Sequence, residues 1–255
     1  MDSTSVSGLV DPQHPIPVAI ERLSAGEPVI PVWVNGEGGV ACRIGSGRSA
    51  QFAKWVPSES ILDLAAETDR LRWAGRYAKV PQVLESGSDP SGSWIVTAAL
   101  PGECAVTARW KADPETAVRV AGAALRELHE SLPVATCPFD WSIGFRLKQQ
   151  RVAQADKQMW LAAAPPIDQL VVCHGDPCVP NTLIGDDGAY AGHVDLGELG
   201  VADRWADLAV GSWSTEWNYG PGWEKTYLEA YGVAADPARI RYYRELWNME
   251  SPVSG

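Results

Sequence analysis

The sequence predicts an α+β fold with two lobes, a small antiparallel-sheet lobe over residues 1–99 and a larger, mainly helical lobe over residues 100–255. Three observations predict it. Short runs rich in Val and Ile dominate the first 100 residues, helical spacing of apolar residues dominates the rest, and Pro101-Gly102 breaks the chain between them. We therefore expect a hinge near residues 98–102.

Four strands are expected in the first lobe, because four runs are short, β-branched and bounded by Gly, Asn or Ser. They cover residues 28–34, 39–44, 50–56 and 93–99. One helix interrupts them. Ser60 is its expected N-cap, apolar residues recur at near-helical spacing from Ile61 to Trp73, and the helix should end at about Gly75.

Two helices of the second lobe begin with Asp-Pro, which joins a capping side chain to a proline at the first helical position. Asp113-Pro114 starts a helix that should end before Pro133, and Asp236-Pro237 starts another near the C-terminus. Their expected buried faces are Val118, Ala121, Leu125 and Leu128 in the first, and Ile240, Tyr243, Leu246 and Trp247 in the second.

Composition bounds the class of protein. Of the 255 residues, 45% are hydrophobic and 21% charged, as in ordinary globular proteins. No apolar run reaches the ~20 residues of a membrane helix, and the N-terminus (Met1-Asp2-Ser3-Thr4) lacks the pattern of a secretory signal. The five cysteines are an odd number without a C-x-x-C pair. We therefore expect reduced thiols in the cytoplasm. We also expect a monomer without a membrane partner.

The net charge of −11 argues against nucleic acid as a partner, because nucleic-acid binders normally present a basic face. The charge is uneven. Residues 1–99 carry 8 Lys+Arg and 11 Asp+Glu, a net −3, whereas residues 100–255 carry 13 and 21, a net −8. An acidic second lobe suits a polycationic ligand. Charge alone favours the simpler explanation, that many soluble proteins are acidic.

The most informative stretch runs from residue 171 to residue 208. It contains the segments 174–181 (HGDPCVPN) and 193–197 (HVDLG), separated by residues 182–192, which read as a hairpin with Asp187-Gly188 at its turn. Asn181 enters the first strand of this hairpin and Asp195 leaves the second, so both should lie at the same open end. Two neighbouring oxygen ligands at a strand end suit Mg²⁺.

Asp176 lies on the loop before Asn181 and is positioned to accept the proton of an attacking hydroxyl. A loop aspartate, an asparagine a few residues later and an aspartate before glycine are the parts that kinases use for phosphoryl transfer from ATP. The spacing H-G-D-x4-N-x13-D fixes five residues, and chance would give about one match in a few million start positions. The set therefore predicts a kinase, although a single Asp or Asn in a loop is usually a turn residue.

The first lobe offers the expected phosphate-binding groups. Lys54 lies in a strand and Glu67 on the following helix, so the glutamate can hold the lysine against the α- and β-phosphates. Between two strands, Gly36, Gly38 and Gly39 permit a close approach of backbone amides to phosphate. A glycine-rich connection is also commonly only a turn.

Other residues carry weaker signals. His174 is expected to brace the loop, His129 to be structural, and Cys173 and Cys178 lack a base that would make them nucleophiles. Four tryptophans gather near the C-terminus and either pack in the core or form a wall against a sugar ring, packing being favoured. They are Trp205, Trp213, Trp217 and Trp223.

These motifs resemble the aminoglycoside phosphotransferase family from about Val32 to Met249. The resemblance rests on the segments 172–181, 194–197 and 200–208, and the segments 52–54, 95–98 and 136–139 are similar to the branch that acts on the 3″-hydroxyl of streptomycin. It implies a protein-kinase-like bilobal fold that binds ATP between its lobes.

The resemblance also implies roles for individual residues. Asp176 is the implied catalytic base, Asn181 and Asp195 are implied Mg²⁺ ligands, and Lys54 with Glu67 is the implied phosphate-binding pair. The implied adenine contacts come from the hinge, at Thr97, Ala98 and Leu100.

The chain departs from relatives acting on 3′-hydroxyls. Glu198 stands where those relatives often carry Arg, and Leu246-Trp247-Asn248-Met249 replaces their carboxylate-rich C-terminal helix. Both departures favour streptomycin over kanamycin-type drugs. Carboxylates pair well with the two guanidinium groups of streptomycin, and the candidate contacts are Glu198, Asp207 and Glu216, unless Asp207 instead braces the loop.

Three alternatives stay open. The first is a 3′-phosphotransferase or another small-molecule kinase of the same fold, acting on choline, homoserine or an amino sugar. The second is a catalytically dead binding module, which the intact Lys54, Asp176, Asn181 and Asp195 disfavour. The third is a protein kinase, which the short interval between Asp195 and Asp207 disfavours because it has no room for a long activation segment.

Overall fold

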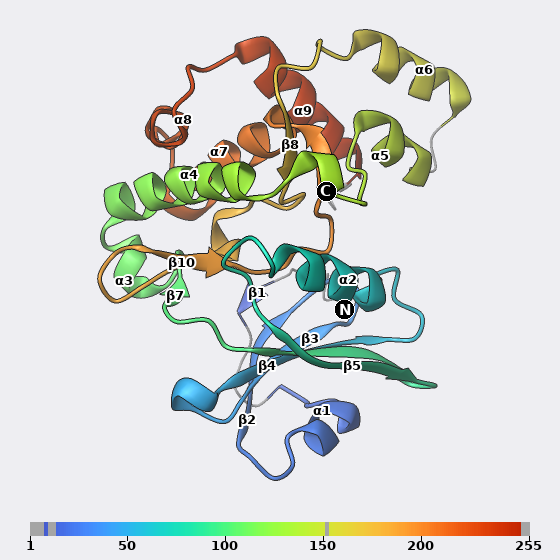
Figure 1. Cartoon of the computed structure of the whole chain (residues 1–255), viewed down its shortest axis with the longest axis vertical. Helices are drawn as coiled ribbons and strands as arrows, with labels where there is room; N and C mark the ends of the chain where they lie inside the picture. Colours follow the sequence, from blue (N-terminus) through green and yellow to red (C-terminus); the bar gives the residue numbers. More distant parts are fainter. Residues whose placement is uncertain (1–7, 10–13, 151–152, 251–255) are drawn as a thin grey trace, which may run out of the picture. The chain divides into compact units, whose positions relative to one another are not determined.

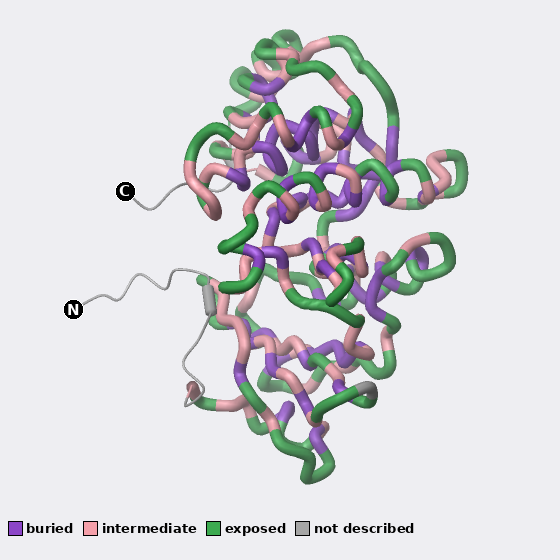
Figure 2. The backbone as a smooth tube through the Cα atoms, turned by 90° about the vertical axis from the view of Figure 1, so that its left-hand side faces the viewer, coloured by how far each residue is buried: buried purple, intermediate pink, exposed green. Residues whose placement is uncertain are grey.

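The structure is a computed structural model that describes residues 8–9, 14–150 and 153–250, so the N-terminal segment read above for a secretory signal lies outside it. The chain forms two compact units. The first comprises Met1–Arg76 and Val80–Leu100, and the second Tyr77–Lys79 and Pro101–Gly255. Figure 1 shows their elements, and Figure 2 shows that buried positions recur along the helices and strands of each unit.

The first unit is built on an antiparallel sheet of six strands in the order β1-β2-β3-β4-β6-β5. The strands are β1 (Gly8–Leu9), β2 (Val29–Val34), β3 (Val40–Ile44), β4 (Gln51–Pro57), β5 (Val83–Asp89) and β6 (Gly92–Ala98). The four strands expected from the sequence are confirmed, each to within one residue at either end. The strand β5 and the short helix α1 (Val18–Leu23) were not expected from the sequence.

The two faces of this sheet carry different groups, an apolar core on one and a lysine–glutamate pair on the other. Ile20 of α1 packs with Cys42 and Ala53 in an apolar core on one face. Because side chains alternate along a strand, Lys54 points to the other face. There it meets Glu67 of α2 (Leu64–Ala74), a helix that lies against β5 and β6. The alternation of side chains along β4 therefore determines that Lys54, the candidate phosphate-binding residue, points toward α2.

The prediction that Ser60 caps α2 was wrong. Asp63, not Ser60, is the N-cap, and its Oδ1 accepts hydrogen bonds from the amides of Ala65 at 3.0 Å and Ala66 at 2.9 Å. The Ser60 hydroxyl accepts from the amide of Leu62 in the preceding turn, at 3.2 Å. The helix itself ends as expected, with Gly75 as its C-cap.

The second unit is mainly helical, with two small antiparallel sheets in the orders β10-β9-β7 and β11-β8. Its strands are β7 (Glu103–Cys104), β8 (Leu170–Cys173), β9 (Thr182–Ile184), β10 (Tyr190–His193) and β11 (Gly200–Asp203). Its helices are α3 (Ala108–Lys111), α4 (Pro114–Ser131), α5 (Ile143–Gln149), α6 (Gln154–Ala163), α7 (Trp205–Tyr219), α8 (Glu224–Tyr231) and α9 (Pro237–Glu250).

Both Asp-Pro helix starts are confirmed, at α4 and α9. The apolar stripe of α4 is buried as expected, and in α9 only Trp247 is half-buried where a buried position was expected. At Gly122, where α4 packs on α8, an added Cβ would lie 2.3 Å from the carbonyl oxygen of Tyr227, so this crossing requires glycine. The predicted combination of antiparallel sheet and helices is thus the observed fold.

All five cysteines are free thiols. Across the described ranges, no helix combines the length and the apolar character that crossing a membrane requires.

The cap of α2 generates the first prediction. Asp63→Ala should destabilise the protein by about 1 kcal/mol, because two amides of the first helical turn lose their acceptor. Urea unfolding followed by circular dichroism measures the change. Ser60→Ala is the matched control and should cost less, since its hydroxyl serves one turn amide outside the helix. An equal or larger effect of Ser60→Ala would contradict the assignment of the cap.

Candidate active site

The loop that carries Asp176 connects the buried strand β8 to β9, where Thr182 and Ile184 are also buried. Its last three residues form the short 3-10 helix η3 (Val179–Asn181). Gly175 has φ of +89°, and a Cβ there would lie 2.3 Å from the carbonyl oxygen of Glu198. Glycine before Asp176 is therefore needed both for the backbone conformation and for the close packing of residue 198.

Asp176 and Asn181 hold each other in one orientation. The Asn181 Nδ2 atom donates to the backbone oxygen of Asp176 at 3.0 Å and to its Oδ2 at 3.1 Å. An ionised carboxylate only accepts hydrogen bonds, so the amide nitrogen must face it. The Oδ1 atom of Asn181 is consequently directed away from Asp176, as a cation ligand would be.

The expected hairpin is confirmed. Thr182 pairs with His193 at its open end, and Gly188 occupies the turn with φ of +78°. The amide of Val194 donates to the carbonyl oxygen of Asn181 at 3.0 Å, which keeps the two flanking segments together beyond the strands. Asn181 and Asp195 therefore lie next to the same end of the hairpin.

Asp195 has an unusual backbone conformation. Its φ is +64°, in the left-handed region that Asp tolerates better than most residues, and its side chain is exposed. The nearby Asp176 is half-buried. Burial and the neighbouring charge of Asp195 raise the pKa of Asp176 above its ordinary value. A site with two carboxylates and an amide oxygen suits a divalent cation by its donor chemistry.

His174 connects the two halves of this site. Its Nε2 atom donates to the carbonyl oxygen of Val194 at 3.0 Å, and its Nδ1 accepts from the amide of Asp176 at 3.3 Å. Both partners fix the neutral tautomer with the proton on Nε2. The ring therefore ties the loop of Asp176 to Val194, the residue between β10 and Asp195, and the expectation that it braces the loop is confirmed.

Asp207 lies beneath the loop and is fully buried, with 0% of its surface exposed. Its Oδ2 accepts from the amide of His174 at 2.6 Å and from His129 Nε2 at 2.9 Å, and its Oδ1 accepts from the amide of Gly175 at 3.1 Å. Both carboxylate oxygens thus accept hydrogen bonds from groups within the protein. This geometry contradicts a substrate contact for Asp207 and agrees with the alternative that it braces the loop.

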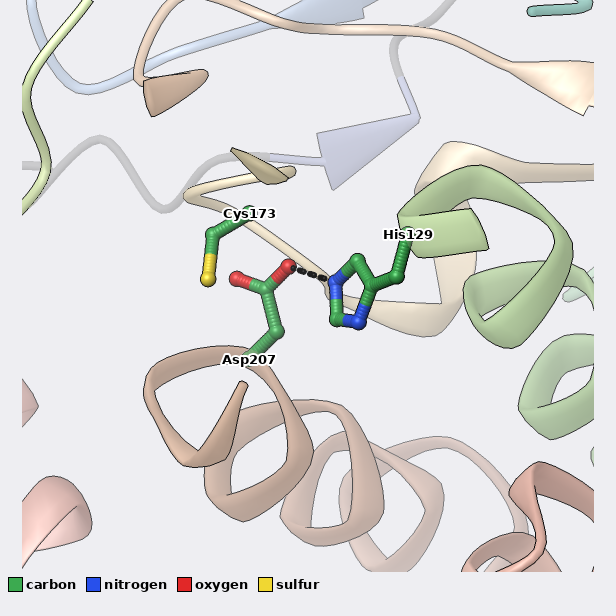
Figure 3. A group of neighbouring side chains, drawn as sticks. All are labelled: His129, Cys173 and Asp207. Atoms are coloured by element: carbon green, nitrogen blue, oxygen red, sulfur yellow. Dashed lines mark hydrogen bonds and ion pairs between the residues drawn. The ribbon is translucent and has the colours of Figure 1, made fainter. Parts of the chain in front are cut away.

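His129, Cys173 and Asp207 form a compact group whose ligand atoms lie within 4.8 Å of one another (Figure 3). It is a hydrogen-bonded brace and not a metal centre. The second ring nitrogen of His129 bonds to the hydroxyl of Tyr231 at 2.9 Å, and the Cys173 thiol donates to the carbonyl oxygen of Asp203 at 3.5 Å. Burial raises the pKa of Cys173 well above its usual value, which disfavours the thiolate that a metal requires.

Two residues that support the loop had not been expected from the sequence. The Ser214 hydroxyl accepts from the amide of Val179 at 3.0 Å, and Asn218 Nδ2 donates to that hydroxyl at 3.2 Å. Ser214 and Asn218 are four residues apart on α7 and share one face. That spacing was visible in the sequence, but nothing there linked it to a loop 35 residues away.

In the first unit, the Lys54 Nζ atom lies 2.9 and 2.8 Å from the two carboxylate oxygens of Glu67. Glu67 is buried with 6% of its surface exposed, whereas Lys54 is half-buried. The expected pairing of this lysine and glutamate is present. A buried carboxylate that holds a partly accessible ammonium presents a fixed positive charge.

The glycine-rich connection between β2 and β3 is closed on itself. The Asn35 Oδ1 atom accepts from the amides of Glu37 at 3.0 Å and Gly39 at 2.7 Å, and the Asn35 carbonyl accepts from Gly38 at 3.3 Å. These amides point inward. The geometry is that of a closed turn and argues against the phosphate contacts expected at Gly38 and Gly39.

The segment expected to contact adenine begins with the last two residues of β6, Thr97 and Ala98, and runs on to Leu100. The Thr97 hydroxyl donates to the carbonyl oxygen of Phe52 at 3.4 Å, and the amides of Ala98 and Ala99 donate to Gln82 and Ala50. Leu100 is half-buried and is the last residue of the first unit.

The two remaining substrate candidates differ in position. Glu198 is exposed, and its backbone packs against Gly175 of the loop. Glu216 follows Ser214 by two residues on α7, a rotation of about 200° around the helix. Because Ser214 faces the loop, Glu216 is turned away from it. Only Glu198 therefore lies beside Asp176 as expected.

Comparison with known proteins identifies the class of protein. Residues 43–243, most of the chain, match the phosphotransferase enzyme family (APH). The chain therefore belongs to this family, and its fold is the protein-kinase-like fold of those enzymes.

Named relatives narrow the comparison. The chain is 36% identical to an aminoglycoside 3′-phosphotransferase of Streptomyces fradiae over 77% of this chain and 83% of that protein. It is 32% identical to a streptomycin 3″-kinase of Streptomyces griseus over 91% and 97%. The solved structure of aminoglycoside phosphotransferase APH(3″)-Id from Streptomyces rimosus superposes with a TM-score of 0.71 at 27% identity, covering 91% of this chain and 97% of that one.

The buried brace generates the second prediction. Asp207→Asn should destabilise the protein by about 3 kcal/mol at pH 7, because the amide offers one acceptor oxygen and turns an NH2 group toward buried donors. Denaturant unfolding measures the change. The control Asp186→Asn alters a carboxylate that is 94% exposed and should shift stability by about 0.5 kcal/mol or less.

The effect of Asp207→Asn on the free energy of unfolding should also depend on pH. Burial alone would raise the pKa of Asp207, but the hydrogen bond and charge of His129 outweigh it and lower the pKa below its ordinary value. A depressed folded-state pKa contributes stability above the unfolded pKa of about 3.9 and loses it as pH falls. The stability gap between the wild type and Asp207→Asn should therefore narrow below about pH 4. A gap that is constant from pH 7 to pH 3 would contradict the brace.

Proposed function

We propose that this chain transfers the γ-phosphoryl group of ATP to a hydroxyl of an aminoglycoside, and that its preferred acceptor is the 3″-hydroxyl of streptomycin. The observation that carries the proposal is the arrangement of Asp176, Asn181 and Asp195 at one end of the hairpin in a member of the phosphotransferase family. The fit to a streptomycin 3″-kinase along nearly its whole length supports the acceptor. A related structure of APH(3″)-Id contains ADP and streptomycin.

A second candidate is phosphorylation of a 3′-hydroxyl. It is favoured by the higher identity, 36%, to the 3′-phosphotransferase of Streptomyces fradiae. Against it stand the shorter coverage of that match and Glu198, which occupies a position where 3′-enzymes often carry Arg. A carboxylate there favours a guanidinium-bearing acceptor over one that needs an arginine partner.

In the proposed reaction Asp176 accepts the proton of the attacking hydroxyl. Asn181 and the amide of Cys178, which donates to Asp176 Oδ1 at 3.4 Å, hold the carboxylate in one orientation. Burial and Asp195 raise the pKa of Asp176, which makes it a stronger base than an exposed aspartate. Alignment of the hydroxyl against this carboxylate supplies most of what phosphoryl transfer requires from a protein.

Asn181 Oδ1 and the Asp195 carboxylate would hold Mg²⁺. When bound, the ion neutralises charge on the phosphate oxygens. Lys54, held by Glu67, would contact the phosphates of ATP, and the segment from Thr97 and Ala98 to Leu100 would contact the adenine. Of the three loop glycines, Gly36 alone is proposed to contact phosphate, because the amides of Gly38 and Gly39 donate to Asn35.

The acceptor is proposed to be cationic. Residues 170–255 contain 13 Asp+Glu and 5 Lys+Arg, and Glu198 is the candidate beside the loop. Carboxylates bind planar guanidinium groups through two parallel hydrogen bonds.

A coupled ADP-release assay tests the proposal on streptomycin, kanamycin, hygromycin B, choline and homoserine, with products identified by mass and NMR. We expect turnover with streptomycin and phosphate on the 3″-oxygen. Preference for kanamycin would select the 3′-candidate, and turnover only with choline or homoserine would overturn the aminoglycoside proposal.

The third prediction concerns the base. Asp176→Asn should lower kcat by about 100- to 10,000-fold, because the amide cannot accept the hydroxyl proton. ATP binding, measured by calorimetry, should change little. Turnover near the wild-type value would remove Asp176 from the mechanism.

The fourth prediction concerns the cation. Asp195→Ala should abolish most of the gain in ATP affinity that Mg²⁺ provides, since a proposed oxygen ligand is lost. Calorimetric titration of ATP with and without Mg²⁺ measures it. Asp187→Ala, at the exposed hairpin turn, is the matched control and should retain the full Mg²⁺ effect. An Mg²⁺ effect preserved in Asp195→Ala would exclude this residue as a ligand.

A further inference from the structure

An exposed tryptophan on α7 has no role in the core. Trp217 exposes 51% of its surface, whereas Trp205 at the start of the same helix exposes only 3%. The Trp217 ring rests on Trp213, with centroids 4.9 Å apart and an angle of 53° between the planes. On Trp213 also lies the guanidinium of Arg244, 5.3 Å from its centroid. We call Arg244, Trp213 and Trp217 the aromatic stack.

The aromatic stack is anchored from three helices. The Nε atom of Arg244 donates to the carbonyl oxygen of Ala209 at 3.0 Å, its Nη2 donates to the Ser212 hydroxyl at 3.2 Å, and the same nitrogen forms a close ion pair with Glu224 of α8. These contacts fix the ring beneath Trp217. Leaving an indole about half exposed forgoes part of the stabilisation that burial gives. The Trp217 ring, which rests on a ring that is itself held in place, is therefore available for binding.

Trp217 lies one helical turn from a residue that supports the loop of Asp176. Ser214, whose hydroxyl holds the amide of Val179, comes one helical turn before Trp217. Three residues advance a helix by about 4.5 Å and return to within about 60° of the same direction. The Trp217 ring is thus next to the face of α7 that supports the loop, in the same unit as Asp176 and Asp195.

We propose that Trp217 is a platform for the acceptor and that it stacks against a guanidinium- or ammonium-bearing ring. This inference rests on the proposed function. Indole is the strongest cation–π partner among the side chains, and planar guanidinium stacks on it especially well. The chain uses this pairing repeatedly, with Arg109 4.5 Å from the Trp110 centroid and Arg22 5.5 Å from that of Trp94. The net −8 charge of residues 100–255 complements such a cation.

Two substitutions separate the aromatic face from apolar volume. Trp217→Leu keeps an apolar side chain without a π-face, and Trp217→Phe keeps a smaller π-face. We expect Leu to weaken streptomycin binding, measured by calorimetry, and to raise its KM by about 10-fold, with Phe within about 3-fold of the wild type. The KM for ATP should not change. Trp33→Leu, which removes a half-buried tryptophan of β2 in the other unit, is the control and should leave both constants unchanged.

Several outcomes decide the inference. A wild-type streptomycin affinity in Trp217→Leu, or equal losses in the Leu and Phe variants, would overturn it. If the wild type binds streptomycin without phosphorylating it and Leu weakens that binding, the platform stands while the proposed reaction fails. If the wild type neither binds nor phosphorylates streptomycin, both are overturned. A larger loss for streptomycin than for kanamycin would support stacking of guanidinium in particular.

Discussion

The position of the candidate active site depends on one buried carboxylate. Asp207 has no exposed surface, so its charge is tolerable only if hydrogen-bond donors surround it. Two of these donors are the amides of His174 and Gly175, immediately before Asp176, and the third is His129 of α4. His129 is in turn held by Tyr231 of α8. The loop can therefore shift only if a buried charge loses its partners, which makes Asp176 a preorganised group.

The residues on the loop and hairpin can be predicted from the sequence, whereas the residues that hold the loop from a distance cannot. The sequence spacing predicts that Asp176, Asn181 and Asp195 lie together, and they do, because a loop and a hairpin place them through local geometry. Asp207 and Ser214 act on the loop from 32 and 35 residues away, measured from Gly175 and Val179, and tertiary packing alone brings them there. From the sequence, Asp207 could either contact the substrate or brace the loop. Its complete burial favours the brace.

Errors in the first unit have similar physical causes. Ser60 and Asp63 are both good caps, and the choice of Asp63 depends on where the chain turns into α2. The strand β5 is at the edge of the sheet and mostly exposed, which suits its Glu and Ser residues. Gly87 lies against the Trp94 ring, where a Cβ would come within 2.7 Å. The sequence of β5 consequently lacks the β-branched pattern that revealed its neighbours. Glycines 38 and 39 suggested phosphate contacts, but Asn35 uses their amides to close a turn.

The preference among acceptors must come from residues outside the catalytic set. A base, a cation site and a held lysine serve any kinase of this fold equally well, so they cannot distinguish a 3′- from a 3″-hydroxyl. Glu198 and Trp217 differ from them, because neither belongs to the proposed catalytic set and both lie in the same unit as Asp176. A carboxylate binds the edge of a guanidinium through hydrogen bonds, whereas an indole binds its face. A guanidinium group offers both an edge and a face, and an ammonium group offers neither, so the proposed contacts of Glu198 and Trp217 would favour a guanidinium-bearing acceptor.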